Sequence, residues 1–304
     1  MPRMPSAAAT TPLRFGLVAS RLHRQDAQGG LADWLRACDA DIRALGVELH
    51  VVGGTCEAIQ RHGLLAGYPK LVPYPRGREG GVMRLVSRIA GGLEAGDALD
   101  GVIYLIDPVD PSSLYPETLA LKRQCVVHGK PFVSTVAGAV EWIAVESARA
   151  GIAASGAAGR WRAIETQTVA LIAHDALKDR MVEFASKHFD LLSRFETRVA
   201  TGTTGGRLND MAWARGWPAD RPWVRRYQSG PLGGDAQIAE LVLEQRCQKA
   251  IFFEDPHVAR QHEADIQLLE RAVCSVTRHT TCFNSPAMAQ RWAAAFGGLV
   301  DDYS

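Results

Sequence analysis

The chain carries the same order of landmarks twice. Each half opens with an apolar run, at residues 15–19 and 169–173, and later has an apolar run that ends in Asp-Pro. The two aspartates, Asp107 and Asp255, lie about half of the 304-residue chain apart. Solenoid repeats are much shorter, about 20–50 residues, so this spacing indicates a tandem duplication of one whole domain.

Short apolar runs alternate with helical patterns in both halves. Met181, Phe184 and Ala185 recur at helical spacing, as do Ile238 and Leu241. The apolar runs show no polar alternation, which is typical of parallel strands buried on both faces. The sequence therefore predicts the α/β class, as two tandem three-layer α/β/α domains with parallel sheets, of flavodoxin-like or Rossmann-like type.

Composition divides the chain into four segments. We predict a disordered tail at 1–12, a first domain at 13–146, a linker at 147–164 and a second domain at 165–304. The tail has no apolar core of the kind that signal peptides carry. The linker prediction rests on residues 147–159, which are rich in small side chains and include three glycines.

Charge and cysteine usage exclude several classes of partner. The chain has 34 Lys+Arg and 33 Asp+Glu, so its charge offers no case for a nucleic-acid or membrane partner. The six cysteines form no CxxC pair, so the spacing of zinc or redox sites is absent. No apolar run approaches the ~20 residues that span a bilayer. We therefore expect free thiols in a reducing compartment and a cytoplasmic protein.

Polar clusters follow four strands of the second half. Ligands of parallel sheets bind beyond the carboxyl ends of the strands, so these clusters predict one site at that edge. The clusters are His174-Asp175 with Lys178, Thr-Gly-Thr-Thr-Gly at 201–205, Ser-Gly-Pro-Leu-Gly-Gly-Asp at 229–235, and Asp255-Pro256 followed by His262 and Asp265.

The residue types suit an anion and a proton transfer. Hydroxyls and amides of the 201–205 turn, close to a helix N-terminus, can cradle a phosphate, and Lys178 adds a cation. Asp235 follows two glycines, where backbone can approach a ligand closely, and is a candidate general base. Neighbouring acids can tune its protonation and a histidine can polarise a carbonyl; these residues are Asp175, Asp255, Asp265 and His262.

Each cluster also has a simpler interpretation. Asp235 alone fits a helix N-cap, and Thr203 and Thr204 fit caps or turn formers. A lone histidine such as His262 is more often a surface or core residue, and Asp255-Pro256 is a common strand end. The functional interpretation rests on all four clusters falling at strand ends within one domain.

Together these motifs resemble methylglyoxal synthase. The resemblance covers about residues 166–295, and its most specific motif is Ser-Gly-Pro-Leu-Gly-Gly-Asp at 229–235. It implies a methylglyoxal-synthase-like fold and a metal-independent carbon–oxygen lyase that converts dihydroxyacetone phosphate to methylglyoxal and phosphate. The other matching motifs are Leu-Ile-Ala-His-Asp at 171–175, Ala-Thr-Gly-Thr-Thr-Gly at 200–205, Ile-Phe-Phe-Glu-Asp-Pro at 251–256 and Gln-His-Glu-Ala-Asp at 261–265.

The resemblance also implies residue roles. In that family the aspartate at the position of Asp235 is the base, and the histidine at the position of His262 acts on the substrate oxygens. The resemblance implies no metal or organic cofactor. It implies a homo-oligomer, usually a hexamer. The acidic supports are Asp175, Asp255 and Asp265, and the substrate-binding positions are His174, Lys178, Thr201, Gly202, Thr203, Thr204, Ser229 and Gly230.

The first half lacks most of these side chains. Aligned on the shared turns, Thr201 corresponds to Gly53, Thr204 to Cys56 and Asp235 to Val82. The position of His262 falls at Leu114 or Tyr115, and His174-Asp175 at Ser20-Arg21. We therefore predict that the first domain is catalytically inactive and structural, so that three chains could form a trimer that mimics a hexamer. The alternative is an anionic effector bound at residues 53–55 with Arg76 and Arg78.

Other functions stay open at this point. The chain could be a non-catalytic regulatory module that binds a phosphorylated effector, or a purely structural protein, but retention of Asp235, His262 and Asp265 argues against both. Three features depart from the family pattern: an aromatic insertion at 213–226, which could be an interface, a lid or a surface loop; the stretch at 281–286; and the absence of a longer C-terminal tail.

Overall fold

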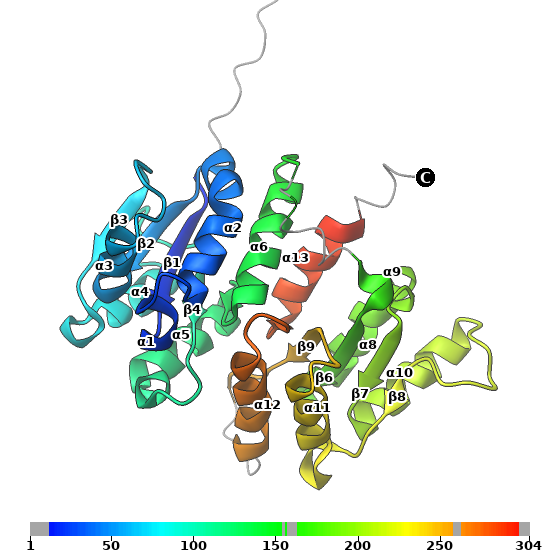
Figure 1. Cartoon of the computed structure of the whole chain (residues 1–304). Coiled ribbons are helices and arrows are strands. Elements are labelled where there is room, and N and C mark those ends of the chain that lie inside the picture. Colours follow the sequence, from blue (N-terminus) through cyan, green and yellow to red (C-terminus); the bar gives the residue numbers. More distant parts are fainter. Residues whose placement is uncertain (1–11, 154–155, 157–162, 258–262, 298–304) are drawn as a thin grey trace, which may run out of the picture.

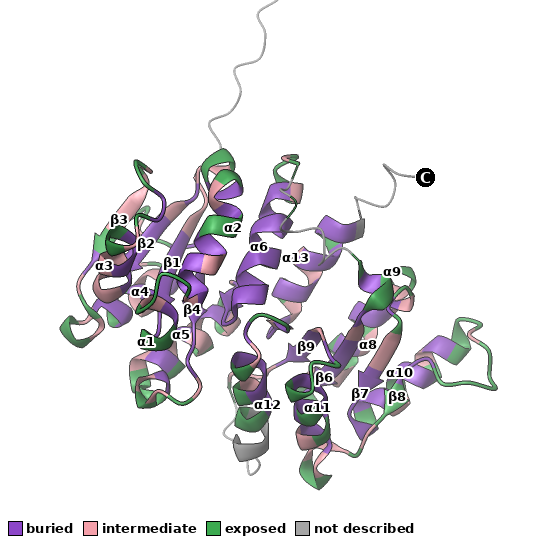
Figure 2. Cartoon of the chain, viewed as in Figure 1, coloured by how far each residue is buried: buried purple, intermediate pink, exposed green. Residues whose placement is uncertain are grey.

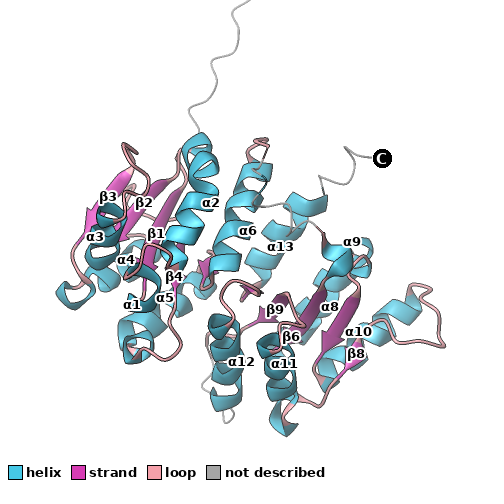
Figure 3. Ribbon diagram, viewed as in Figure 1, coloured by secondary structure: helices cyan, strands magenta, loops and turns pink. Residues whose placement is uncertain are grey.

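The structure is a computed structural model, and it describes residues 12–153, 156, 163–257 and 263–297. It contains two five-stranded sheets, one in each half, with helices on both faces (Figures 1 and 3). Every strand pair described in both sheets is parallel. This confirms the predicted α/β class with two parallel-sheet domains.

The first half has the strand order β3-β2-β1-β4-β5. Its strands are β1 (Arg14–Ala19), β2 (Glu48–Val52), β3 (Leu71–Tyr74), β4 (Gly101–Leu105) and β5 (Phe132–Val133). Its helices are α1 (Arg21–Arg24), α2 (Gly30–Leu45), α3 (Gly53–Arg61), α4 (Gly81–Ile89), α5 (Pro116–Val127) and α6 (Val136–Arg149), with short 3-10 turns η1 (Gly77–Glu79) and η2 (Pro111–Leu114).

The second half repeats this topology with the order β8-β7-β6-β9-β10. Its strands are β6 (Thr168–Ala173), β7 (Thr197–Ala200), β8 (Arg225–Arg226), β9 (Lys249–Phe253) and β10 (Thr281–Phe283). Its helices are α8 (Lys178–Lys187), α9 (Phe189–Ser193), α10 (Gly202–Ala214), α11 (Gly234–Leu243), α12 (Glu263–Ser275) and α13 (Pro286–Gly297), with 3-10 turns η4 (Ile164–Thr166), η5 (Asp175–Leu177) and η6 (Gly230–Leu232).

Burial explains why these segments fold as they do. The interior strands β4 and β9 are buried at every position, as expected for strands of a parallel sheet covered on both faces. Helix α2 ends at Leu45 because Gly46 adopts a left-handed conformation, with φ of 61°. Helix α6 begins where the Thr135 side chain accepts a hydrogen bond of 2.9 Å from the Gly138 amide. Among the helices of the described ranges, none combines the length and hydropathy of a membrane span.

The two halves share one core on one side of the molecule. A single apolar cluster runs from α2 and α6 of the first half into α8 and α13 of the second. Helices α6 and α13 lie side by side in the middle of Figure 1, and Figure 2 shows both largely buried. Separate clusters fill the other faces, under α4 and α5 in the first half and under α11 and α12 in the second.

A buried ion pair joins the halves inside this junction. Lys249 of β9 pairs with Glu141 of α6, and neither side chain is exposed to solvent. Glu141 also accepts hydrogen bonds from Thr281 Oγ1 at 2.6 Å and from Trp292 Nε1 at 2.8 Å. Burial lowers the pKa of Lys249 in spite of the carboxylate beside it. The position that corresponds to Lys249 in the first sheet is Gly101, so the pair has no counterpart at that position.

The predicted linker differs from the structure at its start. Helix α6 continues to Arg149, three residues into the segment predicted as linker, and Ser147 is fully buried. Small side chains that suit a linker also suit a helix packed closely against its neighbours. Residues 154–155 and 157–162 lie outside the described residues, as does most of the predicted tail.

Candidate active site

A cavity of about 220 Å³ opens at the carboxyl edge of the second sheet. Eight of the thirteen predicted site residues line it, because strands β6, β7, β8 and their following turns end side by side. Apolar groups that the sequence did not single out complete the wall, namely Ile172, Ala173, Pro231 and Phe252. The eight predicted residues are His174, Asp175, Lys178, Thr201, Thr203, Ser229, Gly230 and Asp235.

The other five predicted residues are not among those described on the cavity wall. Gly202 starts α10, and Thr204 is fully buried behind that start. Asp255 follows β9 and accepts a hydrogen bond of 3.0 Å from the His257 amide. His262 lies outside the described residues. Asp265 belongs to α12, but its side chain is also outside the described part of the chain.

Asp235 lies in the first turn of α11 with its side chain 6% exposed. The N-cap of α11 is Gly233, so the interpretation of Asp235 as a helix cap is wrong. Gly233 has φ of 93°, and a Cβ on Gly234 would lie 1.9 Å from the Gln228 carbonyl oxygen, so both positions require glycine. These two glycines turn the chain tightly enough to bring Asp235 Oδ2 within 2.8 Å of a Cβ placed on Gly230. The carboxylate therefore lies directly against the cavity-lining backbone.

Other residues of the cavity wall suit an anion. Helix α10 starts at Gly202 with Thr201 as its N-cap residue, and Thr201 and Thr203 both line the cavity. Amides at the start of a helix of this length carry a partial positive charge. Lys178 at the start of α8 adds a full charge and forms an ion pair with Asp175, whose side chain is 89% exposed. A helix end, two hydroxyls and an ammonium group thus line the same cavity as Asp235.

His174 is oriented by the backbone of the neighbouring strand. The Asp255 amide donates a hydrogen bond of 2.8 Å to His174 Nδ1, and the ring packs edge-on against Phe252 with centroids 4.8 Å apart. Because Nδ1 accepts this bond, a neutral ring carries its hydrogen on Nε2. The Asp255 amide thus fixes the orientation of the His174 ring at the cavity wall.

The first half holds the segment that follows β9. Lys122 Nζ of α5 lies 2.9 Å from carboxylate oxygens of both Glu254 and Glu270. Burial alone would lower the pKa of Lys122, but the two carboxylates together raise it above its usual value. Arg123 Nε donates a 3.0 Å hydrogen bond to the Pro256 carbonyl. No local sequence pattern signals this clamp, since its partners lie more than a hundred residues apart.

The corresponding edge of the first sheet has the same backbone geometry. Gly53 N donates to Pro75 O at 3.1 Å, as Gly202 N donates to Gln228 O at 2.9 Å. Gly80 has φ and ψ of 88° and 11°, close to the 93° and 9° of Gly233. Both turns therefore direct the start of the following helix in the same way.

Strand register corrects one part of the predicted alignment between the halves. Leu17 pairs with Val51 as Leu171 pairs with Ala200, which places Val52 at the position of Thr201. The prediction that Thr201 corresponds to Gly53 and Thr204 to Cys56 is therefore wrong by one residue, and Thr55 takes the place of Thr204. Repeated small residues after β2 and β7 hid this shift. The match of Asp235 to Val82 agrees with the positions of the two glycine turns.

The aromatic insertion at 213–226 is not a lid over this cavity. It connects the end of α10 to the start of β8, at the sheet edge opposite the carboxyl ends. Trp223 is buried and stacks on Phe189 with ring centroids 5.1 Å apart, while Arg198 lies over the Trp217 ring. The insertion therefore covers the far end of the second domain.

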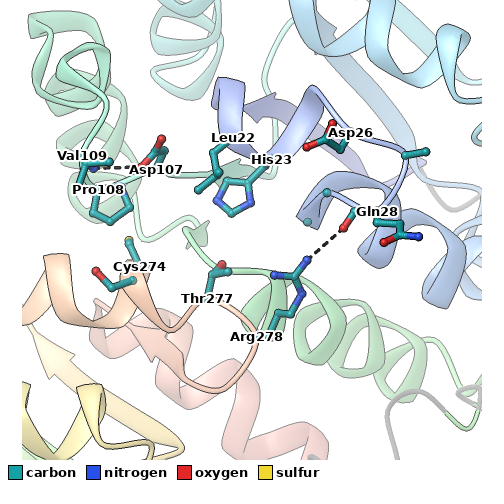
Figure 4. Close-up of a pocket in the computed structure, with 14 residues that line it drawn as sticks. Leu22, His23, Asp26, Gln28, Asp107, Pro108, Val109, Cys274, Thr277 and Arg278 are labelled. Atoms are coloured by element: carbon teal, nitrogen blue, oxygen red, sulfur yellow. Dashed lines mark hydrogen bonds between the residues drawn. The ribbon is translucent and has the colours of Figure 1, made fainter.

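A larger cavity of about 740 Å³ lies between the halves (Figure 4). Figure 4 shows His23 and Asp107 on one side and Arg278 on the facing side. Local partners engage these groups: His23 Nε2 contacts the Ile106 carbonyl at 3.0 Å, and Arg278 Nε donates to Asp33 at 2.8 Å. Burial lowers the pKa of His23. Within the described ranges, none of the predicted site residues lines this cavity, so size alone does not identify the site.

Comparison with known proteins agrees with the chemistry of the smaller cavity. No family model matches the chain. A methylglyoxal synthase of Thermus thermophilus is 46% identical over 110 residues, which cover 36% of this chain and 79% of that protein. The chain belongs to the methylglyoxal synthase family. Methylglyoxal synthases of Clostridium beijerinckii (42% over 108 residues; 36% of this chain and 82% of that protein) and Cupriavidus pinatubonensis (44% over 121 residues; 40% and 85%) are similar to it as well.

The solved structures include a methylglyoxal synthase of Elizabethkingia anophelis, with 34% identity, a TM-score of 0.35, and coverage of 43% of this chain and 78% of that one. The matches named methylglyoxal synthase thus extend over about a third of the chain in sequence. A putative universal stress protein of Pseudomonas aeruginosa is 10% identical, with a TM-score of 0.44, over 95% of this chain and 98% of that one.

Proposed function

We propose that the second half converts dihydroxyacetone phosphate to methylglyoxal and inorganic phosphate. The observation that carries this proposal is one cavity lined by Asp235, by the start of a helix with two threonines, and by Lys178. A base and an anion cradle in one cavity suit a small substrate with an acidic C–H bond at one end and a phosphate at the other. Membership of the methylglyoxal synthase family supports the same reaction.

Proton transfer is the proposed first step. Asp235 takes a proton from the carbon that bears the hydroxyl, and the electron pair of the C–H bond forms the enediolate with the adjacent carbonyl. His174, held by the Asp255 amide, and His262 are the proposed donors to the enediolate oxygens. Asp175, Asp255 and Asp265 are the proposed acidic supports.

Elimination is the proposed second step. The enediolate expels phosphate as the C–O bond breaks, and the resulting enol takes up a proton and tautomerises to methylglyoxal. Lys178, Thr201, Thr203, Ser229 and the Gly230 amide offset the charge of the leaving phosphate, and the start of α10 at Gly202 adds a partial positive charge. Triose isomerisation begins from the same enediolate, so the outcome depends on how the cradle aligns the C–O bond with the π-system.

The experiment that tests this function is a product assay. We expect the pure full-length chain to release methylglyoxal and phosphate in equal amounts from dihydroxyacetone phosphate. A regulatory module would bind a phosphorylated compound in the same cradle and release neither product. Formation of glyceraldehyde 3-phosphate without phosphate release would contradict the elimination step.

We also propose that the first half is a non-catalytic copy of the same domain, which extends from residue 13 through α6 to Arg149, and that the second domain spans 165–304. The shared topology and the matched glycine turns support a common origin. Two such domains in each chain would let three chains rebuild a six-domain ring. Light scattering tests that assembly, and a strict monomer would exclude it.

A further inference from the structure

The first half has its own cavity at the carboxyl edge of its sheet. Its volume is about 510 Å³, more than twice that of the cavity beside Asp235. It occupies the place that the candidate active site has in the second half, between the end of β1, the start of α3 and the turn before α4. Four arginines and three acids line it, and the arginines are Arg21, Arg24, Arg76 and Arg78.

We propose that this cavity binds a phosphate monoester and does not convert it. The start of α3 has the same backbone geometry as the start of α10, because the Gly53 amide donates to the Pro75 carbonyl as the Gly202 amide donates to the Gln228 carbonyl. Gly54 and Thr55, the next residues of this nine-residue helix, line the cavity. Amides at such a helix start favour an anion. What differs between the two cavities is the set of side chains.

The substitutions remove the base and add positive charge. Val82 stands at the position of Asp235, lines the cavity and carries no group that can take a proton. Arg21 stands at the position of Asp175, so an acid becomes a cation. Arg76 stands at the position of Ser229, directly before the glycine turn. Each change favours anion binding and none supports elimination.

Arg24 takes the place of Lys178. Its Nε donates to the Ala19 carbonyl at 3.1 Å and its Nη1 to the Gly54 carbonyl at 3.4 Å. Carbonyl partners position the guanidinium at the start of α3 without neutralising its charge, and a guanidinium has five N–H donors in all. Arg24 is therefore held ready for a phosphate oxygen.

The cavity also has a wall of hydroxyls and room for more than phosphate. Ser20, Tyr104 and Thr118 line it, and burial raises the pKa of Tyr104, which keeps the phenol protonated as a donor. The wall also carries three acids, Glu57, Asp110 and Glu117. Glu57 pairs with Nε and Nη2 of Arg76, which leaves Nη1 of that guanidinium for a ligand, and Asp110 accepts from the Ser112 amide. The Thr118 hydroxyl donates to the Ser112 carbonyl, so Ser20 and Tyr104 are the hydroxyls that suit the oxygen substituents on the carbon chain of a phosphate ester.

Calorimetric titration of the full-length chain with glycerol 3-phosphate tests the proposal. This ester lacks the ketone that acidifies the C–H bond, so neither half can convert it. We expect one binding equivalent in the first half, weakened at least about tenfold in the double variant Arg24→Gln/Arg76→Gln and retained in Lys178→Gln. Arg61→Gln, an exposed arginine at the other end of α3, is the matched control.

The proposal does not depend on the reaction of the second half. If a second equivalent of ester binds to the wild type and is lost in Lys178→Gln, that equivalent reports on the second half alone. Unchanged stoichiometry and affinity in Arg24→Gln/Arg76→Gln would overturn the first-half site. Inorganic phosphate that binds as tightly as the ester would overturn the assignment of an ester.

Hydrogen exchange on the wild-type chain covers the case in which the double variant does not fold. Glycerol 3-phosphate is expected to slow amide exchange at residues 53–56, at the start of α3. No protection there, at ester concentrations that saturate the calorimetric signal, would overturn the proposal.

Discussion

The two carboxyl edges of this molecule share a backbone and differ in side chains. Both have a helix start held to a neighbouring turn by one hydrogen bond, and both have a left-handed glycine before the next helix. At the second edge the turn presents Asp235, and at the first it presents Val82. On the proposed function, the shared backbone forms an anion cradle at both edges, and only the second turn carries a side chain that can act as the base.

The largest expected effect is the difference in activity between substitutions in the two glycine turns. We expect Asp235→Asn to lower kcat for methylglyoxal formation about 10²–10⁴-fold, because the amide cannot take the proton. Val82→Thr, a change of similar size at the matching position, is expected to leave kcat within about twofold. Steady-state assays on both variants check this, and equal losses of kcat would contradict the claim that only the second turn carries the base.

A second prediction concerns the ion pair that the second sheet has and the matching position of the first sheet lacks. Lys249→Met is expected to lower the free energy of unfolding by about 3–5 kcal/mol, because Glu141 is left buried without its charged partner. The double variant Lys249→Met/Glu141→Gln should recover much of that loss. Denaturant unfolding of the wild type, Lys249→Met and the double variant measures these differences. A loss in the double variant as large as that in Lys249→Met, or larger, would contradict this explanation.

A third prediction tests whether the first half supports the second. Lys122→Met leaves Glu254 and Glu270 close together without a cation, so we expect the segment after β9 to shift. We expect kcat/KM to fall by a factor that corresponds to about 0.5–2 kcal/mol of transition-state stabilisation, and we expect most of this fall to lie in kcat. Lys122→Arg should restore most of it. Unchanged kinetics would mean that the clamp only joins the domains.

The smallest expected effect is a pH dependence of stability that arises in the first half. Burial lowers the pKa of His23, so the folded chain favours the neutral ring. The unfolded chain binds the proton more readily, and stability therefore falls as pH drops below about 6.5, by at most about 1.4 kcal/mol per pH unit. His23→Gln should flatten this slope in denaturant unfolding between about pH 5 and 7, whereas an unchanged slope would assign it to other groups.

Much of the fold and the second-half site could be predicted from sequence. Apolar runs without alternation identified the parallel strands, and eight predicted polar residues meet because parallel strands end at one edge. The glycines before Asp235 signalled a tight turn, although the sequence could not separate a helix cap from a base.

Long-range contacts account for what the sequence could not predict. The ion pair of Lys249 with Glu141 and the clamp of Lys122 on Glu254 join residues that no local pattern relates. The one-residue shift at Thr201 needed strand register to resolve. The sequence could not show whether the aromatic insertion at 213–226 is a lid, because that depends on which edge of the sheet it covers.

The central claim is that the substrate reacts beside position 235 and nowhere else in the chain. A crystal structure of the Asp235→Asn variant soaked with dihydroxyacetone phosphate tests it most directly. The account predicts phosphate density at Thr201, Thr203 and Lys178, with the hydroxyl-bearing carbon next to the side chain at position 235. An empty second-half cavity, or a substrate whose carbon chain points away from position 235, would contradict it.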